Sequence, residues 1–91
     1  MQNDTILEFD GVKLDARSHR MSGISNVTFR LAAGEIAVVL LEDDGKYLPL
    51  CDLAEGLIDP DEGSVAFFGE RWQGMLPWRQ SEMRGKIGRV F

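Results

Sequence analysis

GEIAVVLLEDDGKYLPLCDLAEGLIDPDEG, residues 34–63, is the stretch of sequence that decides the fold. Residues 35–41 are a near-continuous apolar run rich in β-branched side chains, which is typical of a strand covered on both faces. An acidic turn, residues 42–45, follows this run. Four apolar side chains then recur at the spacing of one helix face: Leu50, Leu53, Ala54 and Leu57. We therefore expect a short helix that lies back on the strand, and this order of strand, tight loop and helix is a common setting for phosphate binding.

The residues before this stretch predict two paired strands. Residues 6–14 alternate in polarity like a strand, with Asp10-Gly11 as a bulge or bend inside it. Residues 24–31 alternate again, so they are expected to pair with the first strand. Their predicted apolar face carries Val27, Phe29 and Leu31. Residues 32–35 form the expected turn into the central strand.

The residues after the helix predict a turn, a strand, a second helix and the start of another strand. Residues 59–63 (DPDEG) have the chemistry of a turn, and residues 64–68 follow as a strand. Residues 77–84 read as a short helix that begins with proline, where a missing N–H does no harm. Residues 86–91 have the pattern of a strand that the chain does not finish, so we interpret the sequence as a fragment.

Composition places the chain among ordinary globular proteins. It is 44% hydrophobic and 27% charged, too apolar for disorder and too often interrupted for a membrane span. Its 91 residues are enough for one small domain or part of a larger one. A net charge of −5 argues against nucleic acid as the main partner. The single cysteine, Cys51, and the lack of an apolar signal segment at the start predict a cytoplasmic protein.

Three pieces of the chain, taken in order, resemble the opening of the ATP-binding-cassette (ABC) ATPase domain. The first is the entry Gly34-Glu35-Ile36 into an apolar run. The second is the turn Gly-Leu-x-x-Pro-Asp-x-Gly at residues 56–63. The third is Ile87-Gly88-Arg89-Val90-Phe91, after which the family places its Q-loop glutamine. The resemblance covers nearly all of residues 1–91 but only the opening part of the family's domain.

The resemblance implies a fold, a cofactor and partners. The implied fold is α/β and P-loop-NTPase-like: the N-terminal portion of an ABC-type domain, a mixed, mostly antiparallel, twisted sheet around one strand-loop-helix unit. Residues 1–91 would be a partial nucleotide-binding domain. Because the family binds ATP with Mg²⁺ and acts in pairs on a membrane permease, a permease and a second ABC subunit are the implied partners. The chain itself would not span the membrane and would lie at its inner face. The family's active site forms between two copies, so this chain alone is not expected to be catalytic.

The expected phosphate loop departs from the family's pattern. The family's loop is rich in glycine and ends in Gly-Lys-Ser/Thr, since backbone N–H groups hold the phosphates, the lysine reaches the β and γ groups and the hydroxyl holds magnesium. The candidate nucleotide-binding residues here are Gly45, Lys46 and Tyr47, within the loop 41–49. A fit without insertions puts Lys46 in the position of the last glycine and Tyr47 in the position of the lysine. Gly45 then stands in the serine position that comes just before the last glycine, not in that of the magnesium-binding Ser/Thr.

Other residues in and around the loop also depart from the family's pattern. Matching Gly45-Lys46 directly to the family's Gly-Lys pair leaves Leu40 in the first glycine position and Tyr47 in the hydroxyl position. The acidic residues 42–44 would face a triphosphate, and two like charges about 4 Å apart repel by roughly 4 kcal/mol at an effective dielectric of about 20. A helix N-terminus contributes only about 0.3–1 kcal/mol per charge. Pro49 removes one N–H from the loop, and Ala16 stands where the family stacks adenine on an aromatic ring.

Two features allow alternative interpretations. The acidic residues 42–44 fit either a divalent-cation loop or a solvated turn; the solvated turn is preferred because spaced calcium-loop ligands are lacking, so no metal site is predicted. Trp72 and Trp78 flank an apolar segment. They fit either a small satellite core under the last helix or a surface that docks a partner.

The main functional hypothesis is an ABC transporter subunit whose nucleotide site is impaired and whose role is to couple a permease or to scaffold a competent partner. The first alternative is a genuine ATP-binding ABC subunit, with an unusual loop that still accepts nucleotide in the full-length protein. The second alternative is a stand-alone β-rich interaction module. The sequence leaves all three open.

Overall fold

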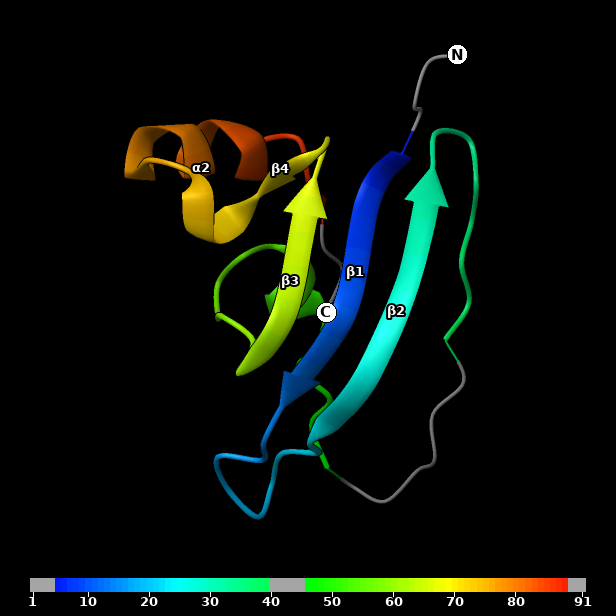
Figure 1. Ribbon diagram of the computed structural model, residues 1–91, viewed down its shortest axis with the longest axis vertical. Coiled ribbons are helices and arrows are strands. Elements are labelled where there is room, and N and C mark those ends of the chain that lie inside the picture. Colours follow the sequence, from blue (N-terminus) through cyan, green and yellow to red (C-terminus); the bar gives the residue numbers. More distant parts are fainter. Residues whose placement is uncertain (1–4, 40–45, 89–91) are drawn as a thin grey trace.

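The computed structural model describes residues 5–39 and 46–88, which form a small mixed α/β unit built on a four-stranded antiparallel sheet (Figure 1). The sheet order is β2-β1-β3-β4. The elements along the chain are β1 (Thr5–Leu14), β2 (Ile24–Ala32), α1 (Leu50–Ala54), β3 (Glu62–Phe67), β4 (Glu70–Arg71), a 3-10 turn η1 (Trp72–Gly74) and α2 (Pro77–Arg84). The three long strands twist together, and α2 lies beyond one end of β3 in Figure 1.

The pairing of the first two strands confirms the sequence-based expectation. Phe9 lies opposite Phe29 across the β1–β2 pair, and their rings stack with centroids 4.7 Å apart. Glu8 and Arg30, which are also opposite each other, form an ion pair on the other face. The register shifts between Phe9 and Val12, at the bulge that Asp10-Gly11 predicted. One face of the sheet is therefore apolar and the other is polar.

The segment that leads into β3 depends on a close approach of two backbones. Gly63 has φ +80°, and a Cβ added there would lie 2.3 Å from the carbonyl oxygen of Gly11. The Asp61 N–H donates to the Lys13 carbonyl at 2.7 Å, and its carboxylate accepts the Asp15 N–H at 2.8 Å. The predicted turn at residues 59–63 is confirmed only up to Asp61, because β3 already begins at Glu62, and the strand predicted at residues 64–68 ends at Phe67. Asp61 also holds the loop that follows β1.

The core lies on the apolar face, between the sheet and the two helices. Its fully enclosed members come from every part of the described chain: Phe9, Val12, Leu14, Ile24, Leu53, Val65, Phe67, Trp72 and Met83. Trp72 is 2% exposed, and its ring stacks on Phe67 with centroids 5.7 Å apart. Trp72 therefore belongs to the main core, whereas Trp78 is 64% exposed. The two tryptophans, considered together in the sequence, have different environments.

The C-terminal end of α1 is where the helices and the sheet meet. Gly56 follows α1 with φ +70° and donates to the Leu53 carbonyl, while the Leu57 N–H donates to the Asp52 carbonyl, which is a Schellman ending. The indole N–H of Trp72 donates to the Ala54 carbonyl at 3.1 Å. Other carbonyls at this end remain for a neighbouring element to satisfy.

Arg84 supplies those bonds from the last residue of α2. Its Nε donates to the Glu55 carbonyl at 2.9 Å and its Nη2 to the Gly56 carbonyl at 2.7 Å. The guanidinium carbon also lies 5.4 Å from the centroid of the Trp72 ring. Hydrogen bonds from a charged donor contribute on the order of 1.5–3 kcal/mol each, so this contact is a strong attachment of α2 to α1.

The predicted central strand is wrong for the residues that can be compared. Residues 35–39 belong to no strand; Ile36 is 91% exposed and Val38 is 80% exposed. In Figure 1 this segment leaves the end of β2 and runs back outside the sheet. A strand that is apolar on both faces needs cover on both, and the described residues build one sheet with helices on a single face. Residues 40 and 41 of the predicted strand lie outside the described residues.

Two further expectations change in extent. The predicted helical stripe ran to Leu57, but α1 ends at Ala54, and Leu57 is 53% exposed beyond the Gly56 turn. The predicted strand at residues 86–91 is not present at residues 86–88, because the Lys86 and Ile87 N–H groups extend the hydrogen bonding of α2 to Met83 and Arg84. Residues 89–91 lie outside the described residues. The helix predicted at residues 77–84 is confirmed as α2.

We expect Gly56→Ala to lower the free energy of unfolding by about 2 kcal/mol or more. The added Cβ would lie 2.4 Å from a ring atom of Trp72, on a backbone with positive φ. Urea unfolding followed by circular dichroism measures the change. Gly74→Ala is the matched control, because a Cβ at Gly74 meets nothing within 4 Å and should be nearly neutral. Equal effects of the two substitutions would contradict the close packing at Gly56.

We expect the double substitution Ile36→Ser and Val38→Ser to change the free energy of unfolding by less than about 0.5 kcal/mol, because both side chains are already exposed. The same unfolding assay measures it. Leu53→Ala, which empties a fully buried site, should cost about 2–5 kcal/mol and serves as the positive control. A loss approaching that of Leu53→Ala would show that residues 36–38 are part of the folded core.

Candidate functional site

The part of the candidate phosphate loop that the structure describes is residues 46–49, directly before α1. Tyr47 is bound at both backbone groups: its N–H donates to the Arg20 carbonyl at 2.7 Å, and its carbonyl accepts the Ser22 N–H at 2.8 Å. These bonds form a parallel bridge between Met21 and Tyr47. The loop between β1 and β2 therefore holds the loop that leads into α1, although nothing in the sequence pairs these two polar segments.

The Tyr47 side chain is turned toward α1. Its hydroxyl hydrogen-bonds the carboxylate of Asp52, which stands in the first turn of the helix. In the fit to the family without insertions, Tyr47 holds the position of the phosphate-binding lysine. A phenol that binds a carboxylate of its own chain cannot act as the cation that a phosphate requires. Asp52 also supplies a negative charge where the helix N-terminus would otherwise favour an anion.

The start of α1 offers few N–H groups or side chains that could donate hydrogen bonds to an anion. Pro49 is the N-cap residue, is almost fully buried, and brings no side-chain hydrogen bond to the helix end. Its ring nitrogen carries no N–H, and its carbonyl accepts the Leu53 N–H at 3.1 Å. The helix contains five residues, so its dipole is small compared with that of a long helix. The apolar side chains of Leu48 and Leu50 pack against the core.

The position expected to stack adenine lies near this loop. Ala16 is exposed in the segment after β1, and Arg17 beside it forms an ion pair with Asp61 at 3.1 Å. Arg20, in the same segment, provides the carbonyl that binds Tyr47. The structure thus brings the segment that contains Ala16 and residues 46–47 together, but an alanine has no ring to stack on a base.

The candidate residues differ in what can be said of them. Lys46 is exposed and Tyr47 is 46% exposed. Gly45 and the acidic residues 42–44 lie outside the described residues. Within residues 5–39 and 46–88, no three His, Cys, Asp or Glu side chains come close enough together to hold a metal ion. Sequence reasoning missed the Tyr47–Asp52 contact, because the two residues are separated by the turn at Pro49 and no spacing rule links them.

The chain is similar to an import ATP-binding protein. It is 32% identical over 87 residues to the phosphonates import ATP-binding protein PhnC of Treponema denticola. The alignment covers 94% of this chain and 33% of that protein, so the chain spans about a third of the length of the relative that it matches. No protein-family model matches the chain. The similarity supports the resemblance to ABC ATPases at the level of the class of subunit.

The two helices are short compared with a bilayer. In the described ranges, no helix has the length and apolar character needed to cross a membrane.

We expect Tyr47→Phe to lower the free energy of unfolding by about 0.5–1.5 kcal/mol, because it removes the hydroxyl that binds Asp52. Chemical denaturation of the single variants Tyr47→Phe and Asp52→Asn and of the double variant gives the coupling energy directly. A coupling energy indistinguishable from zero would contradict the contact. Cys51→Ser is the control on the same helix, since Cys51 is exposed and its change should be small.

Proposed function

We propose that this chain is the N-terminal part of an ABC transporter ATP-binding subunit in which the nucleotide site is impaired. Its role is to couple transport to a membrane permease or to scaffold a second, competent ABC subunit. The similarity to an import ATP-binding protein over 94% of the chain supports the class of protein. The impairment is supported by the residues of the loop and by their contacts. The chain by itself is not expected to hydrolyse ATP.

The observation that carries the proposal is the hydrogen bond between Tyr47 and Asp52. In a working phosphate loop, a cation and a ring of N–H groups meet the phosphates. Here the corresponding side chain is a phenol that is bound to a carboxylate, and the helix begins at a proline. Binding of a triphosphate would require breaking this contact and placing the phosphates near Asp52. Repulsion between such charges is on the order of 1–4 kcal/mol at about 4 Å, depending on solvation.

The partners and the location follow from the same class. A subunit of this class works on the cytoplasmic side, against a permease in the membrane and beside a second ABC subunit. ATP with Mg²⁺ would be the cofactor of a competent site. No nucleic-acid partner is proposed, in line with the net charge of −5.

A second candidate function is ordinary ATP binding through an unusual loop. It is favoured by the similarity to a phosphonates import ATP-binding protein and by the exposed Lys46 next to Tyr47. In this alternative, nucleotide binds once the remainder of the domain is present. The two candidates differ in one measurable quantity, the affinity for Mg-ATP.

The test is calorimetric titration of Mg-ATP into the 91-residue chain and into a chimera joined to the part of the T. denticola relative that the alignment does not cover. We expect both proteins to bind with a Kd weaker than about 1 mM. Restoring the family's loop should then raise the affinity of the chimera at least tenfold. The restoring substitutions are Leu41→Gly, Asp44→Gly, Lys46→Gly, Tyr47→Lys, Leu48→Ser and Pro49→Thr.

A matched control carries the same substitutions but with Tyr47→Ala in place of Tyr47→Lys, so that only the cation is missing. Its affinity should fall back toward that of the unrestored chimera. Micromolar binding by the unrestored chimera, with NMR shift changes centred on residues 46–50, would favour the second candidate. No gain on restoration would contradict the ABC-type architecture of the loop.

A further inference from the structure

Three exposed apolar side chains gather where the β3–β4 turn meets the start of α2. Phe68 is 50% exposed, Leu76 is 61% exposed and Trp78 is 64% exposed. Phe68 lies in the turn between β3 and β4, Leu76 is the N-cap residue of α2, and Trp78 is in its first turn. Figure 1 shows β4 and α2 together at one end of the sheet. Large apolar side chains that gather on a surface often mark an interaction site.

These side chains line two hollows, and Arg79 lies between the two. The larger, of about 440 Å³, is lined by residues that include Arg71, Leu76, Trp78 and Arg79. The smaller, of about 220 Å³, is lined by Phe68, Arg79, Met83 and Lys86. Arg79 belongs to both. We call the six residues Phe68, Arg71, Leu76, Trp78, Arg79 and Lys86 the hairpin–helix surface.

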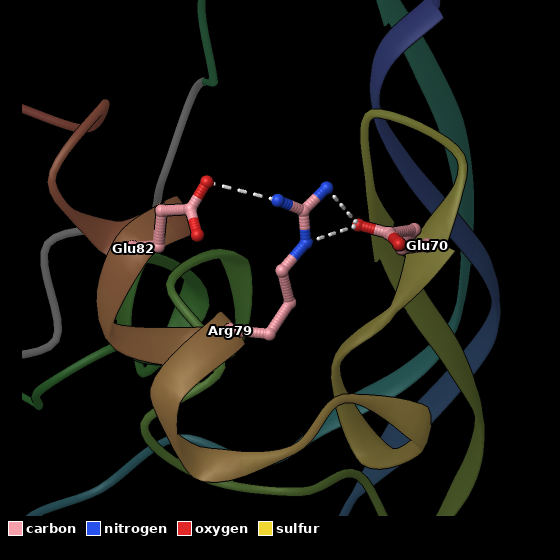
Figure 2. A network of polar contacts seen from close by, with 3 residues as sticks. All are labelled: Glu70, Arg79 and Glu82. Carbon is pink, nitrogen blue, oxygen red and sulfur yellow. Dashed lines mark hydrogen bonds and ion pairs between the residues drawn. The ribbon is translucent and has the colours of Figure 1, made fainter.

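Arg79 is held in place by ion pairs. Arg79 donates from Nε and Nη2 to one oxygen of Glu70, at 3.1 and 2.9 Å, and from Nη1 to Glu82 at 3.0 Å (Figure 2). Figure 2 shows the guanidinium spanning from the helix to the β3–β4 hairpin. These bonds tie the first turns of α2 to β4 and occupy the two carboxylates. The side chains on both sides of Arg79 therefore stand on a preorganised base.

The cations that remain on this surface have no such partners. Neither Arg71 nor Lys86 forms an ion pair within residues 5–39 and 46–88. The Lys86 ammonium lies 6.0 Å from the centroid of the Phe68 ring. With Glu70 and Glu82 counted, the surface has one positive charge in excess, whereas the whole chain has a net charge of −5. Its charge is thus complementary to an acidic partner.

The backbone at Phe68 is unusual for an aromatic residue. Phe68 has φ +51° and is followed by Gly69 with φ +80°, in the tight turn between β3 and β4. Such turns favour Asn or Gly at both central positions, because left-handed backbone crowds a bulky side chain. A phenylalanine here is held in a disfavoured conformation and remains half exposed. An outlier of this kind is a reason to look for a function of the side chain.

We propose that the hairpin–helix surface docks an acidic, amphipathic segment of a partner protein. Apolar side chains of that segment enter the two hollows, and its carboxylates meet Arg71 and Lys86. A lipid surface fits these observations less well, because Glu70 and Glu82 flank Arg79 (Figure 2) and would face anionic headgroups. The proposal concerns a surface separate from the candidate nucleotide loop and does not depend on nucleotide binding.

The experiment uses the two tryptophans of the chain as internal reporters. An ¹⁵N-labelled 91-residue chain is titrated with a designed amphipathic peptide bearing Leu on one face and Glu on its flanks. A second peptide has the same apolar face with Lys in place of Glu. We expect the indole signal of exposed Trp78 to shift with the acidic peptide, the signal of buried Trp72 to stay in place, and the basic peptide to bind at least tenfold more weakly.

The variant Arg71→Glu with Lys86→Glu should reverse the preference between the two peptides, and Trp78→Ala should abolish binding of the acidic one. Leu57→Ala, which removes an exposed apolar side chain elsewhere, is the matched control and should bind as the unaltered chain does. The double charge variant and Trp78→Ala are both checked for an unchanged fold by the dispersion of their NMR spectra. No shift of Trp78 at millimolar acidic peptide, equal binding of both peptides, or preferential binding of phosphatidylglycerol vesicles would overturn the proposal.

Discussion

The attachment of Trp72 and Arg84 to the end of α1 is the constraint on which the rest of this small fold depends. A helix of five residues cannot persist on its own hydrogen bonds, so α1 requires partners for its last carbonyls. The indole N–H and the guanidinium supply them from segments that follow the sheet. The same two side chains stack on each other, which brings α1, η1 and α2 onto one face of the sheet. This packing requires glycine at position 56, because a Cβ there would collide with the Trp72 indole.

A one-sided core of this kind explains the position of residues 35–39. The sheet buries its apolar face under the helices, while its other face carries the Glu8–Arg30 pair and other polar groups. An apolar run such as residues 36–39 finds no second layer within the described chain, and it stays exposed. An apolar hollow of about 380 Å³ opens between β2, Val39 and the Leu48–Leu50 segment. The described residues therefore keep the antiparallel part of the expected architecture, while residues 35–39 of the expected central strand lie outside the sheet.

In the candidate site, the contacts of Tyr47 and Pro49 differ from those expected of a phosphate-binding loop. Backbone hydrogen bonds hold Tyr47 beside the segment after β1. The Tyr47 hydroxyl, however, binds Asp52, and Pro49 occupies the helix start. In the described part of the loop, residues 46–49, the Tyr47 side chain therefore faces a carboxylate and the residue before α1 carries no N–H. This combination underlies the proposal of a subunit that couples or scaffolds, and the similarity to an import ATP-binding protein supplies the class.

The sequence by itself determined most of the local elements and the pairing of β1 with β2, because alternation, turn chemistry and the proline at the start of α2 act over a few residues. It indicated β1, β2, β3, the bulge at Asp10-Gly11 and the turn closed by Gly63. That the loop departs from the family's phosphate-binding pattern stays a prediction from the sequence. The tertiary structure decided what depends on distant contacts. Trp72 is buried and Trp78 exposed because only one of them meets α1, Tyr47 turns to Asp52 across a proline turn, and residues 35–39 leave the sheet because no layer covers them.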